Sequence, residues 1–120
     1  MKSEIWIDHL GVLWVKPEDS AEIDLEEARA CFAVYRSLGC KENKILQLLD
    51  GRKHFTLTDE ARSYAALQGK EFFIASAIIS NNLAMRIAVN FFNRFMNHDV
   101  PFKMFGTERA AIDWLLKFRK

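Results

Sequence analysis

The sequence lacks the residues from which small proteins build metal centres and disulfide frameworks. Among its 120 residues are two cysteines, Cys31 and Cys40, and three histidines. These residues do not occur at the short, repeated spacing of zinc ligands. We therefore expect two reduced thiols, no metal ion and no cofactor.

An excess of charge of one sign is also lacking. The 17 lysines and arginines nearly balance the 16 aspartates and glutamates, which leaves a formal net charge of +1. Domains that bind DNA or RNA normally carry a large positive excess, because they contact phosphate groups. We expect no nucleic-acid partner.

Long hydrophobic runs are absent as well. The longest, at 72–79, is interrupted by Ser76 and is far shorter than the roughly 20 residues that span a bilayer. Acidic residues interrupt the first positions of the chain, where a secretory signal would need an unbroken apolar segment. We expect a cytoplasmic protein with no transmembrane segment.

What the sequence does contain is typical of one globular domain. Half of the residues are hydrophobic and 28% are charged, which is an ordinary composition for a folded protein. No internal repeat, low-complexity segment or flexible linker divides the chain. We expect a single domain over residues 1–120, long enough to bury a hydrophobic core.

The pattern of apolar residues begins with two strands and then alternates between helix and strand. Residues 4–15 contain two short alternating segments separated by a turn, which predicts a hairpin. From Asp24 to Gly39 the apolar residues recur three and four positions apart, which predicts a helix. The same criteria predict strands at 44–49, 72–80 and 102–105, and helices at 58–68, 83–97 and 107–118. Residues 55–57 are compatible with an extended segment or a loop, and Gly69 is expected to end the helix before it.

The predicted strand at 72–80 is apolar on both faces, which is typical of an interior strand with helices above and below it. Strands that alternate with helices form parallel sheets. The predicted fold class is therefore α/β, with a mixed sheet that opens with an antiparallel hairpin and continues with parallel strands. We expect about five strands and four helices.

This order of elements resembles the SpoIIAA-like branch of the STAS-like fold, named after sulfate transporters and anti-sigma-factor antagonists. The resemblance covers essentially the whole chain. It rests on the opening hairpin, the apolar strand that ends at Asp50, the segment AIIS at 77–80, and the closing segment KMFGTERAAIDWLL at 103–116. It implies a mixed-sheet fold and a non-enzymatic regulatory or protein-interaction role.

Well-understood members of that family are switches, in which a serine at a helix N-terminus is phosphorylated and a partner protein is released. The Asp-Ser-Ser/Ala-Gly signature of these switches is absent from residues 50–58, where Thr56 and Thr58 are the only hydroxyl groups. Other relatives resemble carriers of small apolar ligands. The resemblance thus implies two alternatives, an interaction module or a small-molecule or lipid carrier.

Candidate binding residues lie at the predicted carboxyl-terminal edge of the sheet, where ligands bind in open α/β folds. Helix N-termini gather there and, with nearby basic side chains, favour an anion. The candidates for ligand or partner binding are Asp50, Arg52, His54, Thr58, Asn81, Asn82 and Arg86. The simpler alternative is that Thr58 and Thr107 only cap helices and that the basic residues are solvated.

No residue is predicted to be catalytic. His54 lies four residues after Asp50, but neither Ser80 nor Thr58 has the glycine pattern of a nucleophile elbow. Exposure of His54 to solvent is the simpler interpretation. We expect a protein that is not an enzyme.

The predicted helix at 83–97 has more apolar surface than one sheet face can cover. Its polar stripe is narrow, so two apolar sets remain. The second set, Met85, Val89, Phe92 and Met96, is either wedged against a neighbouring helix, or forms a dimer surface, or lines a cavity for an apolar ligand. We expect a homodimer through this surface, with a protein partner or a small apolar ligand still to be identified.

Overall fold

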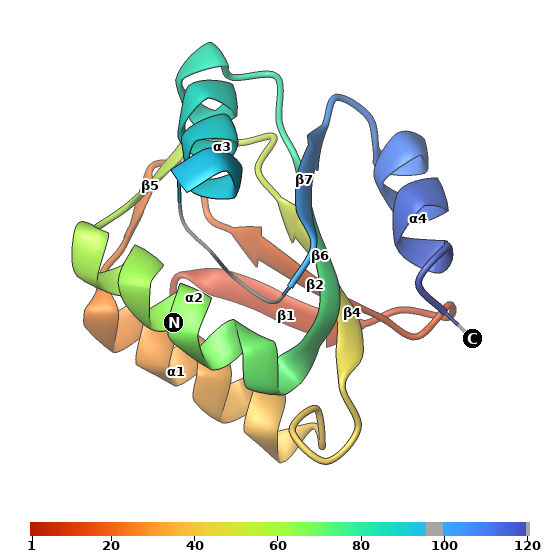
Figure 1. The fold of residues 1–120 in the computed structure, drawn as a ribbon. Helices are drawn as coiled ribbons and strands as arrows, with labels where there is room; N and C mark the ends of the chain where they lie inside the picture. Colours follow the sequence, from red (N-terminus) through yellow and green to blue (C-terminus); the bar gives the residue numbers. More distant parts are fainter. Residues whose placement is uncertain (96–99, 120) are drawn as a thin grey trace.

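The computed structural model describes residues 1–95 and 100–119, and within them it shows a β-sheet with helices on both faces (Figure 1). The elements in chain order are β1 (Ser3–Ile7), β2 (Val12–Pro17), β3 (Ala21–Ile23), α1 (Leu25–Ser37), β4 (Ile45–Asp50), β5 (Phe55–Leu57), α2 (Asp59–Phe72), β6 (Phe73–Ile79), α3 (Leu83–Phe95), β7 (Phe102–Phe105) and α4 (Glu108–Leu116). No helix in these two ranges is both long and apolar enough to cross a membrane.

Five of the described strands form one mixed sheet in the order β1-β2-β4-β6-β7. β1 and β2 are antiparallel, whereas β2, β4, β6 and β7 run parallel to one another. This confirms the predicted fold class, an opening antiparallel hairpin followed by parallel strands, with four helices in the part of the chain that the structure describes. Because the parallel strands end at one edge, the loops after β4, β6 and β7 are neighbours there.

The helices divide unevenly between the two faces of the sheet. Figure 1 shows α4 on one face and α1, α2 and α3 on the other. The core under α4 includes Val12, Leu48, Ala77 and Leu115, all fully buried. A second core, rich in aromatic rings, lies between α1, α2 and the opposite face of the sheet. The two faces therefore have separate cores.

β3 and β5 form a small parallel sheet of their own, apart from the main one. The sequence pattern does not predict β3, because three residues are too few to show an alternation. Residues 55–57, compatible with either strand or loop, form the strand β5 that pairs with it. This pair brings the segments before α1 and α2 side by side.

The predicted end of α2 at Gly69 is wrong. The helix continues to Phe72, and the backbone N–H of Phe73 still donates to the carbonyl of Gly69. A Cβ atom at Gly69 would lie 3.3 Å from the Phe73 ring, which is tighter than an ordinary contact. Glycine therefore lets the Phe73 ring pack closely against the helix, and it does not act as a stop signal.

Three predicted helix starts are confirmed by their caps. The side chains of Asp24, Thr58 and Thr107 each accept a hydrogen bond from the backbone N–H three residues further on. Such caps satisfy N–H groups that the first turn of a helix leaves without a partner. α1, α2 and α4 therefore begin where the sequence places them.

Candidate functional site

A cavity of about 440 Å³ lies on the face of the sheet covered by α1, α2 and α3. Its lining residues come from these helices, from β3 and β5, and from all five strands of the main sheet. The volume falls within the range of about 300–1,000 Å³ that is usual for small-molecule pockets. A cavity for an apolar ligand beside the predicted helix at 83–97 is one of the three alternatives that its apolar pattern allows.

Most of the cavity wall is apolar. Phe32 of α1 is at the centre of a ring cluster, with ring centroids 4.8 Å from Tyr35, 5.3 Å from Phe72 and 5.8 Å from Phe73. Further buried apolar lining residues are Val15, Ile23, Ala28, Phe55, Ala61, Ile78 and Val89. Such ring pairs stabilise the packing behind this wall beyond the area that they bury.

A polar pair interrupts the sheet that forms the cavity floor. The strand register places Leu13, Gln47, Ser76 and Phe102 in one row across β2, β4, β6 and β7. The Ser76 hydroxyl donates a hydrogen bond to the Gln47 carboxamide oxygen at 2.6 Å. Both side chains line the cavity, so the middle of the floor is polar although the ends of the row are apolar.

The polar floor continues onto α1. The Tyr35 hydroxyl lies close to Gln47 and Cys31, and Cys31 lies close to Ser3. All five residues line the cavity, and we call Ser3, Cys31, Tyr35, Gln47 and Ser76 the polar seam. No buried side-chain nitrogen or oxygen in the described residues lacks a hydrogen-bond partner.

The polar seam is uncharged at neutral pH. Burial raises the pKa of the Cys31 thiol to about 11, and the nearby Glu27 carboxylate adds to this effect. Burial likewise raises the pKa of the Tyr35 hydroxyl well above its ordinary value. Glu27 itself is buried, and its carboxylate accepts the backbone N–H of Lys2 at 2.7 Å. The charge closest to the seam is therefore negative.

The exposed lining residues mark where the cavity reaches the surface. They are His54, Thr56, Arg62, Asn82 and Ala84, which belong to β5, to α2, to α3 and to the loops before β5 and α3. The Arg62 guanidinium is paired with Asp59 at 3.1 Å. The mouth is thus polar and opens at the surface that these segments share.

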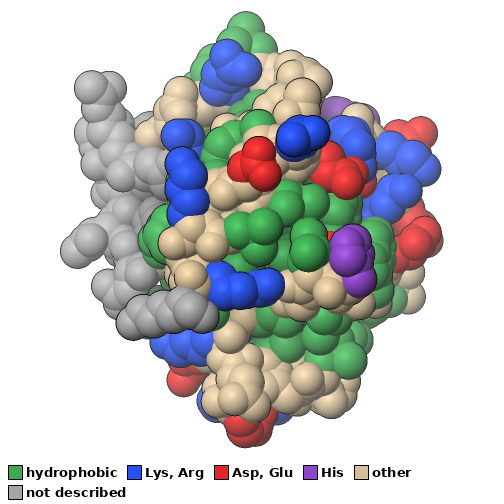
Figure 2. All heavy atoms as spheres, turned by 90° about the vertical axis from the view of Figure 1, so that its right-hand side faces the viewer, with side chains coloured by type: hydrophobic (Ala, Val, Ile, Leu, Met, Phe, Trp, Pro, Cys, Tyr) green, Lys and Arg blue, Asp and Glu red, His purple; other side chains and the backbone are tan. Residues whose placement is uncertain are grey.

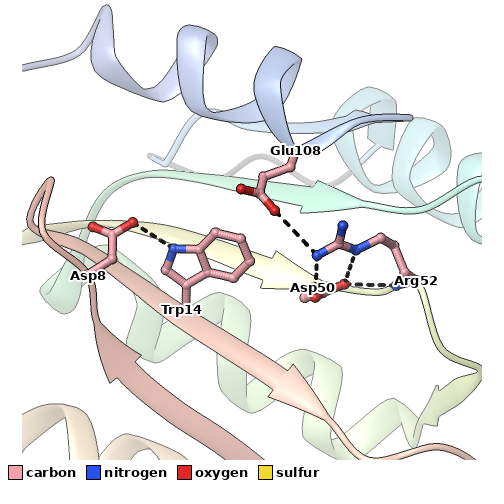
Figure 3. A network of polar contacts seen from close by, with 5 residues as sticks. All are labelled: Asp8, Trp14, Asp50, Arg52 and Glu108. Carbon is pink, nitrogen blue, oxygen red and sulfur yellow. Dashed lines mark hydrogen bonds and ion pairs between the residues drawn. The ribbon is translucent and has the colours of Figure 1, made fainter.

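Asp50 and Arg52, two of the predicted binding residues, form an ion pair on the other face of the sheet, beside α4. The Arg52 guanidinium donates to both Asp50 oxygens at 2.9 and 2.8 Å and lies 3.5 Å from Glu108 of α4 (Figure 3). These bonds lower the pKa of the buried Asp50 carboxyl and raise the pKa of Arg52. In the same view Asp8 accepts the indole N–H of Trp14 at 2.8 Å. The arrangement joins the end of β4 to the start of α4.

The other predicted edge residues mostly serve the backbone. Thr58 caps α2, and the Asn82 carboxamide oxygen accepts the N–H of Met85 in the first turn of α3. Asn81 donates to the Gly106 carbonyl at 3.4 Å. His54 and Arg86 are exposed. The edge does bring these segments together, but only His54 and Asn82 of the seven candidates also line the cavity, and a binding role for the edge stays a prediction.

The predicted dimer surface on α3 needs correction for the residues that can be placed. Val89 is 4% exposed, and Met85 is half-buried against the same core. The Phe92 side chain and Met96 lie outside the described part of the chain. Met85 and Val89, the two members of the set that can be placed, line the cavity, because α3 packs their side against the sheet. Among the α3 side chains that the structure describes, the exposed large apolar ones are Leu83 and Ile87, at 69% and 61%.

A further apolar surface lies on the face of the molecule that carries α4. Figure 2 shows hydrophobic side chains gathered at the middle of this face, with charged side chains around them. Trp6, on the edge strand β1, is 37% exposed and stacks on Trp14 with ring centroids 5.4 Å apart. This surface is separate from the cavity.

The sequence analysis missed the residues of the polar seam. The only signal was the interruption of two apolar runs, by Gln47 at 45–49 and by Ser76 at 72–79. These two positions come from different strands, and only the register shows that they pair. Tyr35 has the spacing of a core residue, and its polar end is not visible in that pattern.

Comparison with known proteins identifies a family and a fold. A family model described as a domain of unknown function (DUF7793) matches residues 5–119. An uncharacterised DUF3478-family protein from Shewanella loihica PV-4 with a SpoIIAA-like fold is similar in structure, at 21% identity and a TM-score of 0.69 over 94% of this chain and 91% of that one. The anti-sigma factor antagonist SpoIIAA in its unphosphorylated form is similar at 14% identity and a TM-score of 0.63, over 94% and 96%. No curated protein sequence matches the chain. The SpoIIAA-like resemblance is therefore confirmed at the level of the fold.

Proposed function

The chain belongs to the DUF7793 family and has a SpoIIAA-like fold, and from these premises we propose that it is a non-enzymatic binding domain for a small apolar molecule. The observation that carries the proposal is the cavity of about 440 Å³ with its predominantly apolar wall. Apolar surface in contact with water is unfavourable, and a ligand that covers it gains the corresponding free energy. This is the carrier alternative of the sequence analysis.

The shape of the cavity supports small-molecule binding better than peptide binding. The wall is contributed by helices and strands whose side chains pack against one another. The exposed lining residues are confined to the mouth. A pocket with an apolar interior and a few polar groups is the usual form of a small-molecule site.

Binding of an uncharged fluorescent probe, N-phenyl-1-naphthylamine, tests this proposal. We expect saturable binding with one probe per chain. Ala66→Trp, which places an indole at a half-buried lining position of α2, should weaken probe affinity by at least about tenfold, because the indole occupies the space.

The matched control is Leu67→Trp. Leu67 is the next residue of the same helix, is 63% exposed and does not line the cavity, so its variant should bind the probe as the wild type does. Absence of saturable binding to the wild type, or equal loss in both variants, would contradict the proposal.

We also propose, as a second candidate, an interaction module in which α3 meets a second copy of the chain. Leu83 and Ile87 are one helical turn apart, so both project from the same side of α3, and both are largely exposed. The structural neighbour SpoIIAA is named as an antagonist of another protein. A self-complementary patch around a two-fold axis is the commonest way to cover such residues.

Native mass spectrometry at low micromolar concentration tests the second candidate. We expect a dimer whose dissociation constant rises at least about tenfold in Ile87→Asp, because each copy would bury a carboxylate. Leu67→Asp, at an exposed apolar position of α2 outside this patch, is the matched control and should leave the dimer intact. A monomeric wild-type protein would rule out this candidate without affecting the first.

A further inference from the structure

The Gln47–Ser76 pair is an unusual choice for the middle of a buried sheet face. The two neighbours in its row are Leu13 and Phe102, and the adjacent row contains Val15, Leu49 and Ile78. Replacing both members of a buried hydrogen-bonded pair by apolar residues is often neutral or stabilising. Stability of the fold therefore does not account for the pair, and its place on the cavity floor suggests a contact with what enters the cavity.

The seam has hydrogen-bonding groups of both kinds. The Gln47 oxygen already accepts from Ser76 at 2.6 Å, while the Gln47 carboxamide nitrogen has two N–H groups and the Ser76 oxygen has lone pairs to accept with. The Tyr35 hydroxyl, which adjoins Gln47, donates or accepts. A ligand group that both donates and accepts a hydrogen bond matches this set.

A charged ligand group does not match it. The lining residues with basic side chains, His54 and Arg62, are exposed at the mouth, and Arg62 is paired with Asp59. The charged group nearest the seam is the buried Glu27 carboxylate, 4.0 Å from the Cys31 sulfur and already bonded to the Lys2 backbone. An anion at the floor would be repelled, and an ammonium group would lose its hydration because the lining residues of the cavity include no Asp or Glu to replace it.

We propose that the cavity selects apolar molecules with one uncharged hydrogen-bonding head group, such as an alcohol or a primary amide, and that Gln47 and Ser76 bind this head. The inference rests on the proposed function, because it names the ligand class of the same cavity. The apolar part of the ligand lies against Phe32, Phe73 and Ile78.

Competition against bound N-phenyl-1-naphthylamine at pH 7 tests the inference, with 1-decanol, decanoate and decylamine as competitors of equal chain length. We expect 1-decanol to displace the probe at a concentration at least about tenfold lower than either charged competitor. The double variant Gln47→Leu/Ser76→Ala should raise the required 1-decanol concentration about tenfold, which is the usual effect of losing a hydrogen bond. Direct titration of the probe into the double variant gives the probe affinity from which its competition is calculated.

Thr56→Val is the matched control, because Thr56 is a polar lining residue at the exposed mouth and lies outside the seam; its variant should retain the wild-type preference. Equal competition by a charged competitor in the wild type would overturn the inference, and so would an unchanged 1-decanol affinity in the double variant. Either result leaves the binding domain itself intact. Absence of probe binding in the wild type, in contrast, would overturn both proposals together.

Discussion

Phe32→Ala is expected to lower the free energy of unfolding by about 3–5 kcal/mol, the usual cost of truncating a buried phenylalanine. Phe32 is 4% exposed, and its ring contacts Tyr35, Tyr64, Phe72 and Phe73. The change removes the centre of this cluster. The neighbouring rings lose their main support. Because Phe32 also lines the cavity, the lost ring adds space to it. Denaturation with urea measures the difference.

The same variant links the core to the proposed function. Any ligand that binds only the folded state stabilises it, by about 2.7 kcal/mol at a concentration 100 times its dissociation constant. Because the Phe32 ring is part of the cavity wall, we expect the dissociation constant of N-phenyl-1-naphthylamine for Phe32→Ala to differ from that for the wild type.

Leu48→Ala is the matched control for this variant. Leu48 is fully buried in the core under α4, so its truncation should cost a comparable 2–5 kcal/mol, roughly. It does not adjoin the cavity, and its variant should keep the wild-type probe affinity. A Phe32→Ala variant that loses less than about 1 kcal/mol would show that the ring cluster is not tightly packed. Equal changes of probe affinity in the two variants would show that the two cores are not independent.

The order of the elements could be predicted from the sequence because it depends on local signals. Alternation in the opening hairpin, the three-and-four spacing after Asp24, and the capping threonines Thr58 and Thr107 each act within a few residues. Pairing between distant segments has no such signal. The strands β3 and β5 are short and stabilise each other across the sequence, so β3 is missed and β5 is left undecided.

The candidate site depends even more strongly on distant pairing. Gln47 and Ser76 are 29 residues apart and meet only because β4 and β6 are neighbours in a particular register. The same limitation explains the error on α3. The amphipathic pattern shows that Met85 and Val89 share a face, but it does not show whether that face meets the sheet, a cavity or another molecule. The structure places Val89 in the core, and the residues that are exposed lie on another side of the helix.

Asp50→Asn is expected to lower the free energy of unfolding at pH 7 by about 1–3 kcal/mol, between the values for exposed and fully buried ion pairs. Asp50 is 4% exposed, but Arg52 is 49% exposed, so solvent weakens the pair. The variant keeps the size of the side chain and removes the charge that holds Arg52 against Glu108. Denaturation at a series of pH values measures the effect.

The pH dependence has a defined direction. Hydrogen bonds from Arg52 lower the pKa of folded Asp50, so its contribution is complete above the ordinary aspartate pKa of about 3.9 and disappears as the pH falls through the lower, folded value. The difference in the free energy of unfolding between the wild type and Asp50→Asn should therefore be constant near neutrality and should disappear in acid. Arg52→Gln, which removes the partner, should show the same acid convergence.

A difference that persists at low pH would mean that Asp50 acts through the hydrogen bonds that its two oxygens accept and not through its charge. The result also bears on the predicted binding edge. If Asp50→Asn lowers stability while leaving probe affinity unchanged, the pair joins β4 to α4 and does not take part in ligand binding. A loss of probe affinity at unchanged stability would place ligand recognition on the α4 face instead, and the cavity would no longer be the main site.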